Sequence, residues 1–353
     1  MSAITELELN ELIKKYKEDS TNLDLINEIA IGYFENHEMK NGDEDLEFFE
    51  LAYKLKRTIK STHNYAWFLY FEWSEIEWRV NEDNAIEKAI LIQKECLEFK
   101  PKSYLPYYQY GYMLLDQKRY EDAIPFLIEA LAIKKDIRII NNLGFCYFNS
   151  ENYETAKIYF EEVVKIQDVD NLNLYNLALT YFHLDDLLGV KRIAEKLKDK
   201  IKPSDDIEFN FGEIVAVYEI GFLYFLIGEY ESAIECLLKQ DIREFDLFDF
   251  IELSYSLYLI DRVKWNLLIK NLVDEKMVLL KEIESGHEDW DEYSVEEKKE
   301  RIQDLKEEIL IGEEALIDKF NLPIPNLKDH IIPEYAGCLL FDCKRHGNIK
   351  NDQ

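Results

Sequence analysis

The sequence predicts an all-α fold, a right-handed superhelix (α-solenoid) of antiparallel helix hairpins with a short irregular C-terminal tail. Three observations predict it. Small residues recur about every 34 positions, apolar residues recur at helical spacing between them, and the 353 residues include only 12 glycines and 7 prolines. Scarce glycine and proline favour long helices over a many-turned β architecture. A repeat of this length is typical of stacked helix hairpins that bury their apolar faces against one another.

The repeat is clearest at its small residues. Gly111 recurs as Gly144, Ala178, Gly221 and Ser254, at separations of 33, 34, 43 and 33 residues. A tyrosine followed three positions later by alanine recurs in the other half of the unit, at Tyr120–Ala123, Tyr153–Ala156 and Tyr230–Ala233. Two helices approach to about 8–10 Å only where a small side chain lets them cross. The spacing therefore predicts one helix crossing in each hairpin.

These residues resemble the tetratricopeptide repeat (TPR) family, whose pattern places an aromatic residue, a Leu–Gly pair, a Tyr and then Tyr-x-x-Ala along two helices. One copy matches at Tyr107, Tyr110–Gly111, Leu114, Tyr120, Ala123, Leu127 and Ala130. The next copy matches at Ile140, Leu143–Gly144, Tyr147, Tyr153, Ala156 and Phe160, and a third at Ile220–Gly221, Tyr224, Gly228, Tyr230, Ala233 and Leu237. The resemblance covers about residues 80–270. It implies a fold and almost nothing about a specific task.

Four regions are expected along the chain. Residues 1–79 read as divergent N-terminal helical hairpins and residues 80–274 as the TPR-like repeat array. Residues 275–320 read as a C-terminal helical hairpin and residues 321–353 as a Pro-containing extended tail. The longer separation between Ala178 and Gly221 predicts a loop near residues 201–210, where Pro203, Ser204 and Asp205 signal a turn.

The charge of the chain restricts its partners. The formal net charge is −30, with 14 acids and 4 bases in residues 1–50 and 12 acids and 3 bases in residues 201–250. Such a chain repels phosphate backbones and anionic membranes, so we expect a partner protein of basic character, no nucleic acid and no membrane. No apolar run reaches the roughly 20 residues that span a bilayer. Five cysteines in so long a chain favour reduced thiols and a cytoplasmic protein.

The TPR resemblance also implies a binding surface, because the first helix of each hairpin lines a concave groove in that family. Carried over by position, the aromatic lining residues are Tyr108, Tyr112, Phe145, Phe148, Tyr175, Phe182, Tyr218, Phe222, Phe225, Phe248, Tyr255 and Tyr258. The lining positions also include Arg138, Asn141 and His183. An aromatic groove fits an apolar peptide or helix. Acidic neighbours such as Glu219 and Glu252 favour a partner with basic flanks.

Two other interpretations of these aromatic residues stay open. Aromatic side chains at helical spacing are usually core, so tight superhelical curvature would bury them without any partner. The protein could also cover the groove itself, and the C-terminal tail is the obvious internal occupant because it is apolar and extended. The sequence therefore leaves open whether the groove is free or filled by residues 321–353.

Residues that bear chemistry are few. His330, Cys338, Cys343 and His346 lie in one stretch, but the spacing H-x7-C-x4-C-x2-H is not a common zinc module, so we assign no metal and no cofactor. His183 has no nucleophile and orienting acid assigned to it, and we assign no catalytic residue. The sequence predicts a non-catalytic scaffold that binds a protein or peptide. The alternatives are an immunity or antitoxin protein that neutralises a basic toxin, a peptide-sensing regulator, and, least favoured, an enzyme.

Overall fold

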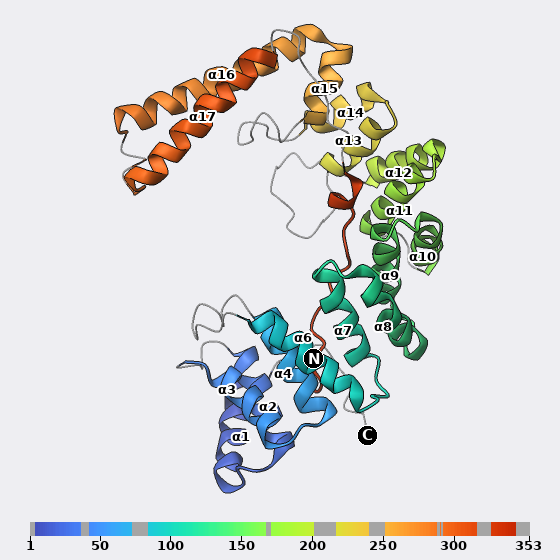
Figure 1. The fold of residues 1–353 in the computed structure, drawn as a ribbon, viewed down its shortest axis with the longest axis vertical. Helices are drawn as coiled ribbons and strands as arrows, with labels where there is room; N and C mark the ends of the chain where they lie inside the picture. Colours follow the sequence, from blue (N-terminus) through green and yellow to red (C-terminus); the bar gives the residue numbers. More distant parts are fainter. Residues whose placement is uncertain are drawn as a thin grey trace. The chain divides into compact units, whose positions relative to one another are not determined.

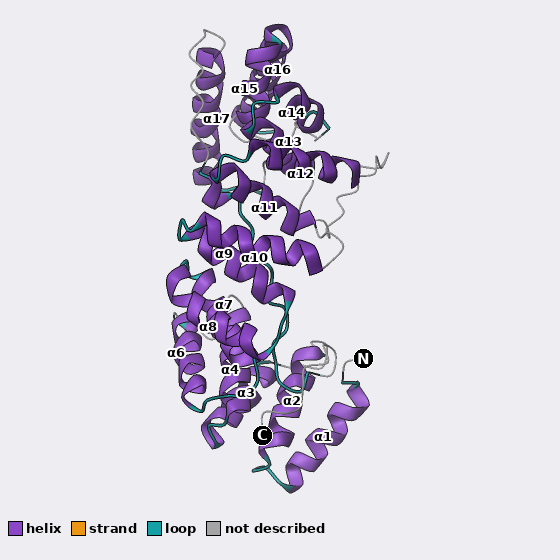
Figure 2. Ribbon diagram, turned by 90° about the vertical axis from the view of Figure 1, so that its right-hand side faces the viewer, coloured by secondary structure: helices purple, strands orange, loops and turns teal. Residues whose placement is uncertain are grey.

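The computed structural model describes residues 4–36, 42–72, 84–166, 171–200, 217–239, 251–287, 290, 292–315 and 326–343. Every regular element in these ranges is a helix, as Figure 2 shows, which confirms the all-α prediction. The chain forms two compact units: unit 1 comprises residues 1–167 and 332–353, and unit 2 comprises residues 168–331. The expected loop near residues 201–210 lies outside the described residues.

Unit 1 is a series of helix hairpins. Its described helices are α1 (Glu6–Glu18), α2 (Leu23–Glu35), α3 (Glu44–Leu55), α4 (Ile59–Phe71), α6 (Ala85–Glu98), α7 (Leu105–Asp116), α8 (Tyr120–Ile133), α9 (Ile137–Asn149) and α10 (Tyr153–Ile166) (Figure 1). Helices pack most closely in the pairs α2–α3, α4–α6, α7–α8 and α9–α10. Residues 332–343 return to this unit without regular secondary structure.

Unit 2 continues the same helix-pair construction. Its described helices are α11 (Asn171–His183), α12 (Leu187–Lys200), α13 (Val217–Leu226), α14 (Tyr230–Leu237), α15 (Ile251–Ile260), α16 (Arg262–Ser285) and α17 (Val295–Ala315), followed by a short 3-10 helix, Leu327–Asp329. The expected boundary between residues 274 and 275 falls inside α16, which runs unbroken for 24 residues. No described helix combines the length and apolar character needed to cross a bilayer.

The repeated small residues lie where paired helices cross. A Cβ atom added to any of three glycines would lie within 3 Å of the side chain 16 positions later. The pairs are Gly111 with Leu127 at 2.8 Å, Gly144 with Phe160 at 2.7 Å and Gly221 with Leu237 at 2.6 Å. At the equivalent position in α15, the Ser254 hydroxyl accepts a hydrogen bond of 3.0 Å from Trp265 Nε1. The 33- and 34-residue spacing thus marks close helix contacts, as the sequence predicts.

The turn inside each of four hairpins, α7–α8, α9–α10, α11–α12 and α13–α14, has one residue in the left-handed conformation. These residues are Lys118, Glu151, Asp185 and Gly228, with φ of 58°, 63°, 57° and 76°. Each turn closes with a six-to-one backbone hydrogen bond, for example from Arg119 N–H to the Leu114 carbonyl at 2.9 Å. This is the Schellman pattern, which favours glycine at the left-handed position. Only one of the four turns has a glycine there.

Replacing Glu151 by Gly is expected to raise the free energy of unfolding by about 0.5–1 kcal/mol, because relief of left-handed strain outweighs the entropy of glycine. The reverse change, Gly228→Ala, is expected to lower it by a similar amount. Urea titration of both variants tests the pair. Glu154→Gly in the first turn of α10 is the control, with an expected loss of about 1 kcal/mol. A loss in the Glu151 variant as well would contradict the turn assignment.

Candidate functional site

A segment without regular secondary structure, residues 332–343, lies against α4, α7 and α9 of unit 1 and ends in a turn at residues 340–343. We call it the C-terminal segment, and Figure 1 draws it in red beside these helices. Its Leu339, Leu340 and Phe341 side chains are buried, with Leu340 fully covered and Phe341 2% exposed, whereas Tyr335 is exposed. The residues of unit 1 that contact it include Glu35, Lys60, His63, Asn64, Phe71, Tyr112, Arg138 and Asn142. We call this surface the tail-binding face.

Two asparagines of this face each bind the backbone of one residue in the segment. The Asn64 side chain donates to the Phe341 carbonyl at 3.2 Å and accepts from the Phe341 N–H at 2.8 Å. Asn142 makes the same pair with Glu334, donating at 2.9 Å and accepting at 2.9 Å. A side-chain amide has one acceptor and two donors, so it can satisfy both backbone groups of a single residue. These bonds recognise backbone groups and are independent of the side chain that each residue carries.

Arg138 and His63 bind two further carbonyls between those points. Arg138 Nη1 donates to the Ala336 carbonyl at 2.7 Å. His63 Nε2 lies 2.8 Å from the Leu339 carbonyl, which can only accept, so Nε2 carries the proton. The backbone of the segment is therefore held at residues 334, 336, 339 and 341.

The His63 ring is fixed from its other side by a buried amide. Its Nδ1 accepts from the Gln93 side chain at 3.3 Å, and Gln93 also donates to the Pro106 carbonyl at 2.8 Å. Gln109 donates in turn to Gln93 at 2.7 Å. Burial lowers the pKa of His63 to about 4, against an ordinary value of 6.5. His63 is therefore neutral at neutral pH, with one tautomer selected by its neighbours.

The far end of the segment is held by charge. Lys60 pairs with Asp342 at 2.6 Å and with Asp24 at 2.8 Å. Burial lowers the pKa of Lys60, but the hydrogen bonds to Asp24 and Asp342 outweigh it and leave that pKa raised. The Cys343 thiol lies 3.3 Å from a Glu35 carboxylate oxygen. This end of the surface therefore complements an acidic residue in the segment.

Two of the sequence-predicted residues in α7 take part in this contact. The Tyr112 ring meets the Tyr335 ring edge-on at 6.4 Å, and its hydroxyl bonds to the backbone of Ala336. The Tyr108 hydroxyl accepts from Asn142 at 3.1 Å and so positions the amide that binds Glu334. Burial raises the pKa of Tyr108 well above its ordinary value.

The two predicted residues of α9 pack against neighbouring helices. The Phe145 ring meets Tyr120 at 5.7 Å, and the Phe148 ring meets Tyr153 at 5.2 Å, both edge-on. Phe148 is fully buried and Phe145 is 6% exposed. The Phe145–Tyr120 contact therefore joins two neighbouring hairpins, and the Phe148–Tyr153 contact lies within one hairpin.

In unit 2 the predicted aromatic residues form a separate row. Its described members are Tyr175, Phe182, Tyr218, Phe222, Phe225, Tyr255 and Tyr258, and Phe248 lies outside the described residues. Tyr175, Phe222 and Phe225 are buried, and the others are half-buried. The His330 ring stacks on Phe222 at 4.0 Å, so the stretch after α17 covers part of this row. Burial lowers the pKa of His330.

Two carboxylates lie beside the unit 2 row. Burial raises the pKa of Glu252, although hydrogen bonds, one of them from Tyr218, lower it. Burial raises the pKa of Tyr175 too, and the negative charges of Glu219 and Glu252 add to that rise. The row therefore combines aromatic surface with negative charge.

The strongest contacts of the tail-binding face come from residues outside the predicted aromatic set. His63 and Asn64 lie in α4, within the region expected to be a divergent hairpin, and Asn142 is one position past the predicted Asn141. One signal was present in the sequence. Residues 61–64 (Ser-Thr-His-Asn) are polar and lead directly into an apolar run, and all four are buried. Buried polar side chains need partners, and here the C-terminal segment supplies two of them.

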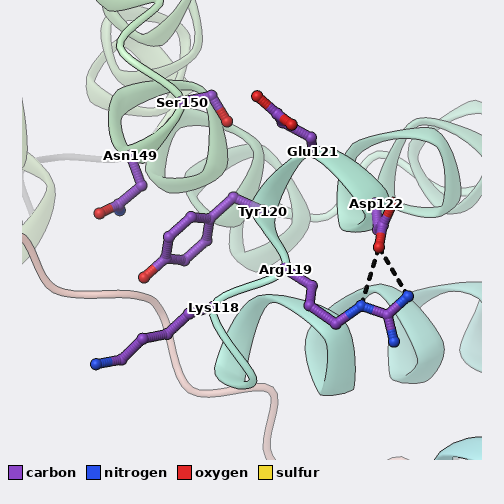
Figure 3. A pocket seen from close by; sticks show the side chains of 7 residues that line it. All are labelled: Lys118, Arg119, Tyr120, Glu121, Asp122, Asn149 and Ser150. Atoms are coloured by element: carbon purple, nitrogen blue, oxygen red, sulfur yellow. Dashed lines mark hydrogen bonds and ion pairs between the residues drawn. The ribbon is translucent and has the colours of Figure 1, made fainter.

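A cavity of about 190 Å³ lies between the α7–α8 turn and the end of α9 (Figure 3). It is lined by Lys118, Arg119, Tyr120, Glu121, Asp122, Asn149 and Ser150. Arg119 is already paired with Asp122, at 2.9 and 2.7 Å, as the dashed lines in Figure 3 mark. Across the described parts of the chain, no group of three His, Cys, Asp or Glu side chains could hold a metal ion. His346 lies outside those parts.

Comparison with known proteins finds a family model that matches two of the hairpins. A tetratricopeptide repeat model matches residues 106–137 and 137–170. The human N-alpha-acetyltransferase 16, NatA auxiliary subunit, is 20% identical over 235 residues, which is 65% of this chain and 26% of that protein. The chain therefore spans about a quarter of the length of this curated relative.

Several solved structures are similar at low identity. YrrB, described as a TPR protein with an unusual peptide-binding site, has a TM-score of 0.44 and 17% identity over 53% of this chain and 91% of its own. Pseudomonas aeruginosa pilF has a TM-score of 0.47 and 16% identity over 69% and 99%. Yeast Tom70 has a TM-score of 0.44 and 13% identity over 88% and 60%. TPR proteins generally act as protein-interaction scaffolds that bind protein or peptide partners, and such scaffolds are typically non-catalytic.

Proposed function

Because this chain is a TPR-like helical repeat protein, we propose that it is a non-catalytic scaffold that binds a peptide along the tail-binding face of unit 1. One observation carries the proposal: Asn64 and Asn142 each bind both backbone groups of one residue in the C-terminal segment. Such pairs suit a peptide ligand, because main-chain hydrogen bonds supply affinity whatever the sequence. Tyr108 and Tyr112 support this role through Asn142 and Tyr335.

We propose the unit 2 row as a second surface, for a partner with basic character. Tyr218, Tyr255 and Tyr258 are half-buried, so part of each residue is exposed. Cationic side chains are attracted both to aromatic faces and to carboxylates such as the half-buried Glu219. Arg262 already lies 3.7 Å from the Tyr258 ring centroid, which is an internal example of that contact. This surface favours the version of the scaffold that binds a basic protein.

Selection of random dodecapeptides displayed on phage tests the scaffold proposal. The full chain and its Leu340→Asp variant serve as baits, because the variant weakens the hold on the C-terminal segment. We expect clones whose binding falls at least tenfold when Asn64→Ala and Asn142→Ala are combined. Ile158→Ala, at a side chain 63% exposed on α10, is the control that should leave binding unchanged. The proposal would be contradicted if, on both baits, replacing the two asparagines or the unit 2 tyrosines left the binding of the selected clones unchanged.

Clones that depend on Tyr218 address the unit 2 surface. They are expected to be rich in Arg and Lys and to lose affinity as salt rises, because exposed charges are screened beyond about 10 Å at 0.1 M ionic strength. Tyr218-dependent clones with neutral sequences and salt-independent affinity would remove the basic-partner proposal.

A further inference from the structure

We propose that the C-terminal segment is a tethered ligand of the tail-binding face, and that the external ligand is a peptide with three consecutive apolar residues followed by an acidic one. This inference rests on the proposed function and specifies its ligand. The motif is the one that the segment itself presents, Leu339-Leu340-Phe341-Asp342.

The apolar part of the motif is the part that is buried. Leu339, Leu340 and Phe341 are each no more than 2% exposed, and the Phe341 ring packs edge-on against His63 at 4.7 Å. Full burial of such side chains contributes roughly 1.5–3 kcal/mol each. The backbone bonds to His63 and Asn64 fix the register in which these three side chains enter the surface. Affinity for a foreign peptide should therefore depend on this apolar triplet.

The acidic position is set by Lys60. The Asp342 side chain is only 11% exposed, whereas Asp24, the other partner of Lys60, is 80% exposed. If a basic residue took the place of Asp342, its positive charge would lie beside the part-buried ammonium group of Lys60 and would repel it. The face should therefore reject peptides with a basic residue after the apolar triplet. This preference is opposite in sign to the basic character that we propose for partners of unit 2.

The other end of the segment is held less selectively. Tyr335 is 60% exposed and touches Phe71 and Tyr112 only through ring edges, at 6.2 and 6.4 Å. Asn142 binds the backbone of Glu334, which any residue other than proline provides. The face should therefore discriminate among residues at the positions equivalent to 339–342 and tolerate different residues at the position equivalent to Tyr335.

The covalent tether makes the segment a competitor. A tethered ligand acts at an effective concentration in the millimolar range, so an identical free peptide occupies few sites until the tethered copy is weakened. A change confined to the segment should therefore increase the affinity for a free peptide. A change in the face should decrease it. These opposite signs distinguish a binding surface from a fixed piece of core.

Fluorescence anisotropy with a labelled peptide of residues 331–343, under reducing conditions, tests the inference. The full chain with Leu340→Asp is expected to bind this peptide at least tenfold more tightly than the wild-type chain. Adding Asn64→Ala should abolish the gain, and a peptide with Asp342→Lys should bind at least tenfold more weakly. Leu310→Asp is the matched control, because it makes the same change at a side chain 55% exposed on α17, and it should leave peptide affinity near the wild-type value.

Circular dichroism on each chain shows whether the helices remain. A folded Leu340→Asp chain that binds the peptide no better than wild type would overturn the inference. If the Leu340→Asp chain unfolds, the Asp342→Lys chain is tested instead. Tighter peptide binding than in the wild-type chain supports the tethered ligand, and unchanged binding overturns it. The selected phage clones could depend on Asn64 and Asn142 while the 331–343 peptide does not bind. In that case the scaffold function stands and this inference alone is wrong.

Discussion

Lowering the pH from 6.5 to 5 is expected to cost unit 1 about 2 kcal/mol of stability through His63, at about 1.4 kcal/mol for each pH step below its ordinary pKa. The folded pKa is about 4 and the ordinary value is 6.5. Between these values the unfolded chain binds a proton that the folded chain does not. The contribution of neutral His63 is therefore complete above pH 6.5 and is lost progressively towards pH 4, where the total loss reaches about 3 kcal/mol.

The physical cause of this loss is that a proton on His63 Nδ1 would place one hydrogen-bond donor against another. In the folded chain Nδ1 faces the Gln93 amide, which donates to it, so a proton on Nδ1 has no acceptor there. Burial of the charge adds to this cost. Urea titrations at several pH values measure the slope, and His63→Gln provides the control because its amide does not titrate. His330 contributes equally in both chains, so the difference between their slopes isolates His63.

NMR titration of the His63 ring gives an independent check. A midpoint near 4 is expected. A midpoint near 6.5, or equal slopes in the wild-type and His63→Gln chains, would mean that the ring is not held neutral between Gln93 and the segment.

Phe341→Ala is expected to weaken the docking of the C-terminal segment by about 3–5 kcal/mol, the usual cost of truncating a buried phenylalanine. The side chain is 2% exposed and packs on His63, and the substitution leaves the backbone bonds to Asn64 in place. The loss should appear in the segment first, because the helices keep their own contacts. A cost of 3 kcal/mol increases the open population about 100-fold.

Chymotrypsin cleavage after Tyr335 reports that open population when opening is fast relative to cleavage. The matched control is Phe99→Ala, which makes the same truncation at a side chain 44% exposed beyond the end of α6. We expect about 100-fold faster cleavage in the Phe341 variant and little change in the control. Equal cleavage rates in the two variants would show that Phe341 does not anchor the segment.

Much of the fold could be predicted from the sequence, because the repeat is local and regular. Gly111, Gly144 and Gly221 recur at a near-constant period, and each permits a close contact 16 positions later in the same hairpin. A helix crossing of this kind depends on residues that are near one another in the chain. The turn positions follow the same period for the same reason.

The tail-binding face could be predicted only in part. The bonds from His63 and Asn64 reach residues 276 and 277 positions away, and no periodic pattern encodes a contact at that distance. The lining positions carried over from the TPR pattern include Tyr112 and Arg138, which do contact the segment. They include Asn141, whereas the side chain that binds Glu334 belongs to Asn142. One position corresponds to about 100° around a helix, which is enough to change the face.

Amide hydrogen exchange at Glu334 and Phe341 in the full wild-type chain tests the central claim most directly, namely that the tail-binding face holds the backbone of the C-terminal segment through Asn64 and Asn142. Both amides should be strongly protected. Asn64→Ala should remove protection at Phe341 first, and Asn142→Ala at Glu334 first, since each loss leaves buried groups unpaired at a cost of about 1–3 kcal/mol. Exchange of both amides at the rates of an unstructured peptide in the wild-type chain would contradict the claim.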